Sequence, residues 1–101
     1  MAVIDDTTVP VPKLEVRVRN VRGVIRIAVP ESAFDLSETA GFIWRRIDGR
    51  RTAAEIGRLL AAEYEVTAEE AVADTKEILA SLAEEGAIAL SPAGPQADGV
   101  G

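Results

Sequence analysis

The side chains of this sequence that could take part in chemistry are carboxylates and a few hydroxyls. The chain has no cysteine and no histidine, which excludes disulfides, thiolate nucleophiles, imidazole acid–base catalysis and Cys/His metal sites. Acidic pairs occur at 69–70 and 84–85, but no loop has the ligand spacing of an EF-hand. Ser32 and Ser37 have no histidine to activate them. We therefore predict a protein that is not an enzyme and that holds no metal or cofactor.

Charge is distributed unevenly along the 101 residues. Through Arg58 there are ten basic and eight acidic residues, whereas from Leu59 onward Lys76 is the single basic residue against nine acidic ones. A protein that reads nucleic acid must present a basic face to phosphate. The arginine pairs at 45–46 and 50–51 form the most basic cluster, and we interpret them as a solvated turn in preference to a phosphate site.

The first third of the chain predicts strands. Residues 1–12 are polar and interrupted by proline, which indicates a flexible arm. Residues 14–19 alternate apolar and charged side chains, residues 20–23 have turn chemistry, and residues 24–29 resume the alternation, which predicts a β-hairpin. Pro30 ends the second strand because it has no amide to donate. Residues 32–36 can form a short third strand, and we expect one edge of this strand to be unpaired.

The remaining sequence predicts helices at about 38–47, 53–64 and 68–85. Ser37, Thr52 and Thr67 precede them as N-caps, and Gly49 and Gly86 follow as breakers. Residues 87–90 suggest a terminal strand or wing, and 91–101 a disordered tail. The fold class that we predict is α+β, a winged helix-turn-helix over residues 13–90. It has an N-terminal three-stranded antiparallel sheet, then three helices, then a short C-terminal wing.

Winged helices commonly bind DNA through their last helix. Here that helix carries six carboxylates and only Lys76 as a cation, so its insertion among phosphates would be repulsive. What remains is binding of another polypeptide by β-augmentation, in which an extended peptide adds to an unpaired strand edge. The apolar shoulder Val72, Leu79 and Ala83 would line a pocket beside the strand at 32–36 if the third helix packs alongside it.

Several short motifs together resemble the PqqD-like family, which includes the RiPP (ribosomally synthesised and post-translationally modified peptide) precursor peptide recognition elements. They are Leu36-Ser37, Thr39-Ala40, Ile43-Trp44, Asp48-Gly49, Arg51-Thr52 and Glu55-Ile56, followed by Tyr64, Asp74, Leu79, Leu82 and Gly86. The resemblance spans about residues 14–90. It implies a winged helix-turn-helix that binds the leader segment of a ribosomally made precursor peptide and delivers it to a modifying enzyme.

Carried onto this sequence, the resemblance implies that the leader adds as a strand beside the third strand and lies against the third helix. The implied peptide-binding residues are Ala33, Phe34, Asp35, Leu36, Val72, Lys76, Leu79 and Ala83. The implied partners are the leader and a radical SAM enzyme, a cyclase or a leader peptidase. We expect a cytoplasmic protein that binds neither nucleic acid nor membrane. A winged-helix DNA-binding regulator and a structural subunit of an enzyme complex remain the alternatives.

Overall fold

The computed structural model describes residues 4–91, which form five strands and three helices. No helix in this part of the chain is long and apolar enough to span a bilayer. In chain order the elements are β1 (Val9–Pro12), β2 (Arg17–Val21), β3 (Val24–Val29), β4 (Ser32–Asp35), α1 (Glu38–Arg46), α2 (Ala53–Tyr64), α3 (Ala68–Glu84) and β5 (Ile88–Ser91).

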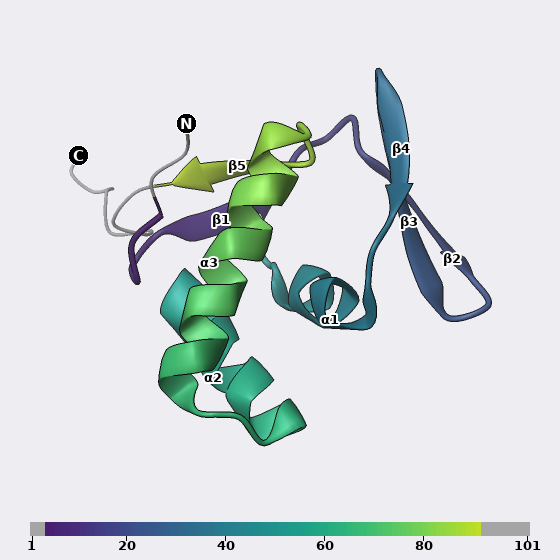
Figure 1. Ribbon diagram of the computed structural model, residues 1–101. Helices are drawn as coiled ribbons and strands as arrows, with labels where there is room; N and C mark the ends of the chain where they lie inside the picture. Colours follow the sequence, from purple (N-terminus) through teal and green to yellow (C-terminus); the bar gives the residue numbers. More distant parts are fainter. Residues whose placement is uncertain (1–3, 92–101) are drawn as a thin grey trace.

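Strands β2, β3 and β4 form an antiparallel sheet in that order, with β4 at one edge. The β2–β3 turn consists of Arg22 and Gly23, both with positive φ, which is the two-residue hairpin geometry that matches the twist of the strands. Strand β2 begins three residues later than expected, and Leu14 is fully exposed. In Figure 1 the β2–β3 hairpin projects to one side, away from β1 and β5.

The structure contains a second sheet that the sequence did not predict. Strand β1 pairs antiparallel with β5, with Val9 opposite Ser91 and Pro12 opposite Ile88. Part of the predicted flexible arm is therefore a strand, and Thr8, Val9 and Pro10 are buried. The main-chain carbonyls of Thr8 and Asp6 also accept hydrogen bonds from the first turn of α2. Residues 1–3 and the predicted tail beyond Ser91 lie outside the described residues.

Three helices are confirmed, with ends close to those predicted. The side chains of Ser37, Thr52 and Thr67 each accept a hydrogen bond from a first-turn amide, at 3.1 Å in all three cases. Such caps satisfy amides that have no partner within the helix. They fix the residue at which each helix begins.

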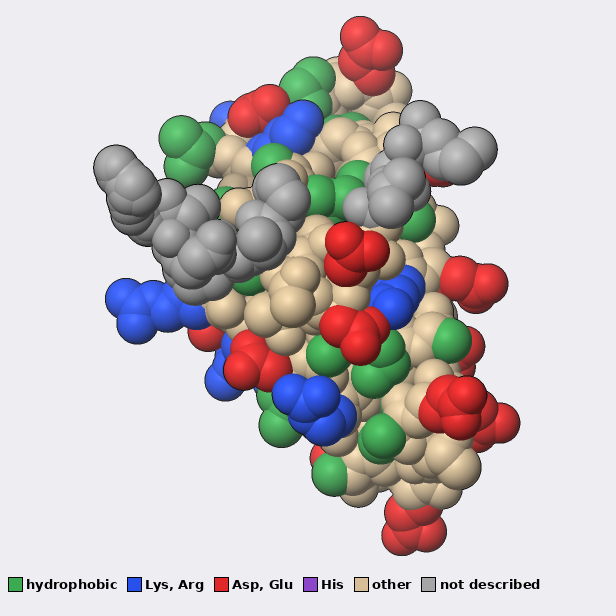
Figure 2. All heavy atoms as spheres, turned by 90° about the vertical axis from the view of Figure 1, so that its left-hand side faces the viewer, with side chains coloured by type: hydrophobic (Ala, Val, Ile, Leu, Met, Phe, Trp, Pro, Cys, Tyr) green, Lys and Arg blue, Asp and Glu red, His purple; other side chains and the backbone are tan. Residues whose placement is uncertain are grey.

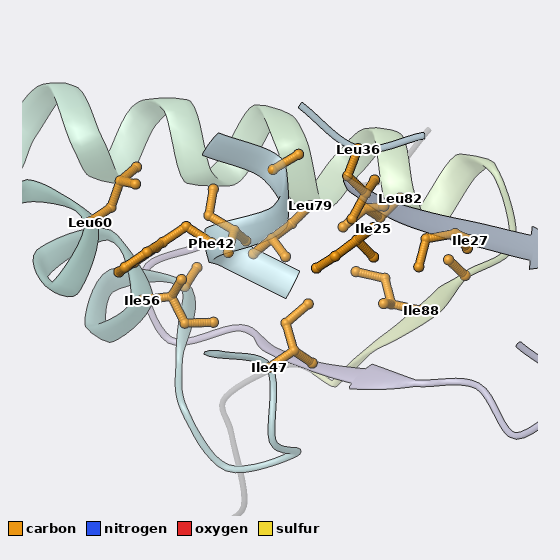
Figure 3. Close-up of a cluster of buried hydrophobic side chains, with 14 of the residues drawn as sticks. Ile25, Ile27, Leu36, Phe42, Ile47, Ile56, Leu60, Leu79, Leu82 and Ile88 are labelled. Carbon is orange, nitrogen blue, oxygen red and sulfur yellow. The ribbon is translucent and has the colours of Figure 1, made fainter. Parts of the chain in front are cut away.

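One hydrophobic core joins the helices to both sheets. Figure 3 shows side chains of α3, among them Leu79 and Leu82, together with Ile25 of β3, Leu36 and Ile88 of β5. Ile27, Ile43, Ile56 and Leu79 have no exposed surface. Because α3 contributes to the core along one stripe only, its neighbouring faces remain available as surface.

Candidate functional site

A groove of about 370 Å³ lies between β4 and the C-terminal half of α3. Its β4 wall continues into the start of α1. The lining residues are Phe34, Asp35, Leu36, Ser37 and Ala40 on one side and Glu77, Ile78, Ser81, Leu82 and Glu85 on the other.

Helix α3 presents two rows of side chains to this groove. Ile78 and Leu82 are four residues apart and form an apolar row, while Glu77, Ser81 and Glu85 form a polar row beside it. Leu82 is 2% exposed, whereas Glu77 and Glu85 are exposed. The groove therefore has an apolar floor and an acidic rim.

Strand β4 offers unpaired main-chain groups along the same groove. The amide of Leu36 donates to the carbonyl of Ile25 at 2.8 Å, and Phe34 is opposite Ile27. Since hydrogen-bonded and non-hydrogen-bonded pairs alternate in an antiparallel ladder, Phe34 directs its main-chain groups toward β3. Ala33 and Asp35 consequently direct theirs outward. Within residues 4–91 no strand pairs with that edge of β4.

The side chain of Asp35 lies on one face of the sheet, where Arg26 of β3 binds it. The guanidinium Nε lies 2.7 Å from Asp35 Oδ1, and Nη2 lies 3.3 Å from Oδ2. This hydrogen bond from Arg26 lowers the pKa of Asp35 from its ordinary value. The pair fastens the edge strand to its neighbour on the face of the sheet opposite to Phe34, and leaves the main chain of Asp35 unobstructed.

The predicted site residues of the third strand lie where a strand partner would reach them. Phe34, Asp35 and Leu36 line the groove, and Ala33 is exposed beside it. Phe34 is half-buried and packs on the core, and Leu36 is 9% exposed. These four positions are therefore brought together on one edge.

The four predicted residues of α3 do not line this groove. Val72 and Lys76 lie at a separate hollow with Asp6, Ala54 and Arg58, and Lys76 forms an ion pair with Asp6. Leu79 has no exposed surface, and Ala83 packs against the core. The side chain of Val72 is held close to Gly57, where an added Cβ would lie 2.6 Å from the Val72 Cα.

Ile78, Ser81 and Leu82, with the flanking Glu77 and Glu85, are groove residues that sequence reasoning did not select. The helical periodicity of α3 places Ile78 and Leu82 at the centre of its apolar stripe, which is the face that a helix ordinarily turns to the core. The sequence predicted that the apolar shoulder Val72, Leu79 and Ala83 would line the pocket. Val72 packs against Gly57, so α2 covers the Val72 side of α3. The periodicity of α3 alone does not predict which side α2 covers.

The side of the molecule that carries β1 and β5 is drawn in Figure 2. Figure 2 views the molecule from the left-hand side of Figure 1 and shows acidic and basic side chains interspersed. No group of three or more potential metal ligands occurs within residues 4–91. The β4–α3 groove is distinguished by the combination of apolar side chains with a strand edge that is unpaired among the described residues.

Comparison with family models gives one match, to coenzyme PQQ synthesis protein D (PqqD), over residues 27–88. The chain belongs to the PqqD family. The matched region runs from the middle of β3 to the start of β5 and so includes both walls of the groove. A comparison with curated proteins gave no match.

Solved structures share the fold of this PqqD-family protein. The NMR structure of the PqqD truncation of Methylobacterium extorquens PqqCD, described as a stand-alone RiPP recognition element, aligns with a TM-score of 0.74 at 28% identity, over 86% of this chain and 95% of that one. Lasso peptide synthetase B1, complexed with the leader peptide, aligns with a TM-score of 0.71 at 23% identity, over 79% and 96%. The crystal structure of PqqD from Xanthomonas campestris aligns at 0.53 and 28% identity, over 73% and 84%.

Proposed function

We propose that this protein is a leader-peptide recognition element of RiPP biosynthesis. The leader segment of a ribosomally made precursor adds as a strand to the outer edge of β4 and lies in the groove against α3. The single observation that carries the proposal is the coincidence of an unpaired strand edge with an apolar groove of about 370 Å³. Membership of the PqqD family and the likeness to a RiPP recognition element support it.

Binding follows from the geometry of β4. The amides and carbonyls of Ala33 and Asp35 pair with the main chain of the leader, which gives affinity with little dependence on sequence. Every second leader side chain then points to the same side as Phe34 and Leu36, over Ile78 and Leu82. These apolar contacts select the leader, because they are lost when a polar residue takes that position.

The protein itself carries out no chemistry in this proposal. It holds the leader so that the rest of the precursor reaches a separate modifying enzyme or leader peptidase, and it acts in the cytoplasm, where the precursor is made. The precursor and a modifying enzyme are thus its two partners. The likeness to a domain cut from PqqCD supports a role beside an enzyme.

We also propose that the fold is a winged helix-turn-helix within residues 13–90. Helices α2 and α3 are joined by a short turn and pack on each other, as the close approach of Val72 to Gly57 requires. The terminal strand β5 takes the place of the wing. The acidic side chains of α3 favour a peptide ligand for this surface over DNA.

A proline in β4 tests the proposed mode of binding. Ala33→Pro removes one outward amide that β3 does not use, and edge strands tolerate proline at such positions. We expect the affinity for the leader to fall by about tenfold, since one hydrogen bond is lost and the ring obstructs the edge. Isothermal calorimetry with a synthetic leader from a precursor gene paired with this one measures the change.

The matched control is Val18→Pro, which removes an outward amide from β2 at the opposite edge of the same sheet. Both variants must first give the circular dichroism spectrum of the parent protein. Leader affinity should survive Val18→Pro. Equal affinity in the parent protein and in a folded Ala33→Pro variant would contradict strand addition at β4.

A further inference from the structure

The groove carries negative charge at its rim, on two glutamates that no cation offsets among the described residues. Three of its ten lining residues are acids, Asp35, Glu77 and Glu85, and none of the ten is lysine or arginine. Asp35 is already bound by Arg26. Within residues 4–91, Glu77 and Glu85 form no ion pair.

Acidic side chains gather where α3 ends, although that position is unfavourable for them. Glu84 and Glu85 stand at the C-terminus of the helix, and no basic residue lies in its last turn. The C-terminal end of a helix carries partial negative charge, so carboxylates there are destabilising and cations are stabilising. A neighbouring hollow adds Glu15 and Glu31 to this end of the groove, against Lys13 alone. A cation brought by a ligand would relieve this repulsion.

The spacing of Glu77 and Glu85 sets a register for such cations. Eight residues of helix separate them, which corresponds to about 12 Å along the axis at a rise of about 1.5 Å per residue. An extended peptide spans that distance in about four residues, at roughly 3.3 Å each. Positions i and i+4 of a strand point to the same side, and so does the position between them, i+2.

We propose that this groove selects leaders in which an apolar residue is flanked, two positions away on each side, by lysine or arginine. This inference rests on the proposed function and names the ligand class of that site. The apolar side chain lies over Ile78 and Leu82. The flanking methylene stems cover the rest of the apolar floor, and their charged ends reach Glu77 and Glu85 at the rim. Leader side chains on the other face meet the neutralised pair of Arg26 and Asp35, so no charge is selected there.

Selection from a random library tests the proposal without knowledge of the natural leader. Random 12-residue peptides displayed on phage are selected on the immobilised full chain, with prior depletion on the Ala33→Pro variant. We expect the enriched sequences to share an apolar residue with lysine or arginine two positions before and after it. Enrichment of neutral or acidic residues at these flanks would overturn the proposed charge preference and leave leader binding standing.

Charge reversal assigns the preference to the two glutamates. In the double variant Glu77→Lys and Glu85→Lys, an enriched peptide should bind about three- to tenfold more weakly at low salt, because each exposed pair is worth at most a few-fold. The control variant Glu63→Lys with Asp74→Lys changes net charge equally at exposed positions outside the groove. Equal weakening in both double variants would mean that net charge alone attracts the peptide, and would overturn the inference.

The outcomes of the selection also separate this inference from the proposed function. If the parent protein enriches no peptide beyond those that the Ala33→Pro variant removes, strand addition itself fails. Suppose instead that peptides with basic flanks are enriched and that both double variants bind them as tightly as the parent protein does. Strand addition then holds, and the role of Glu77 and Glu85 is overturned.

Discussion

Asp35 belongs to the groove through its main chain and to the sheet through its side chain. The hydrogen bond from Arg26 lowers its pKa in the folded protein, whereas the unfolded value is about 3.9. Stability from this pair is therefore present above about pH 4 and is lost as the pH falls through the folded pKa. The effect is small, because both side chains are about half exposed.

Asp35→Asn removes this titration. We expect the substitution to lower the free energy of unfolding at neutral pH and to leave it unchanged at a pH below the folded pKa of Asp35, where the carboxyl of the parent protein is protonated. Urea unfolding at the two pH values measures the difference. An equal loss at both values would show that the ion pair is not the cause.

Thr75 is a second residue whose surroundings make a clear prediction. Its side chain has no exposed surface, and its hydroxyl has no hydrogen-bond partner among the described residues. Because an unpaired buried hydroxyl carries a desolvation cost, Thr75→Val should raise the free energy of unfolding by about 1 kcal/mol. Thr75→Ser keeps the hydroxyl, removes a methyl group and should lower it. A destabilised valine variant in urea unfolding would contradict the unpaired state of this hydroxyl.

At the residue scale, Phe34, Asp35 and Leu36 of the predicted set line the groove, and the four predicted residues of α3 do not. The positions of β4 follow from strand alternation and a short edge, both of which are local patterns. On α3 the choice between the Val72 side and the Ile78 side depends on how α2 packs. Since that packing is settled by a contact between two helices, the periodicity of α3 alone was insufficient.

The packing of α2 on α3 depends on Gly57. A Cβ at this position would lie 2.6 Å from both the Cα and the Cγ2 of Val72, so the backbone of α3 would have to move. We expect Gly57→Ala to lower the free energy of unfolding by about 1–3 kcal/mol, despite the better helix propensity of alanine. Thermal and urea unfolding measure the change.

Gly41 provides the matched control, because it is also a buried helical glycine. A Cβ there would lie 3.6 Å from Ile25 Cδ1, which is ordinary contact. Gly41→Ala should therefore leave stability unchanged or raise it by up to about 1 kcal/mol. If both variants behave alike, close packing of α2 and α3 is not what requires Gly57.

Helices and turns were the elements best predicted from the sequence, because their signals are local. Ser37, Thr52 and Thr67 cap the helices as their types suggested. Strand β1 was missed for the opposite reason. Its partner β5 is some eighty residues away, two of its four residues are prolines, and no local pattern in residues 9–12 reveals that pairing.

Across the whole molecule, basic and acidic side chains are concentrated in different elements. Four arginines and no acid occur between residues 16 and 30, whereas acidic residues dominate α3. The groove lies between β4 and the acidic helix α3. The α+β class followed from local strand and helix patterns, and the family from short motifs distributed along the chain. The detailed site required the three-dimensional arrangement of two elements that are forty residues apart.

The measurement that tests strand addition most directly is an amide NMR titration of the labelled protein with a synthetic leader from a precursor gene paired with this one. We predict shifts concentrated at residues 33–36 and at 77–85, with the amides of Ala33 and Asp35 gaining protection from hydrogen exchange. Shifts centred on the turn at 45–51, or on the hollow around Val72 and Lys76, would contradict binding in the β4–α3 groove. An absence of shifts with a saturating leader would contradict leader recognition itself.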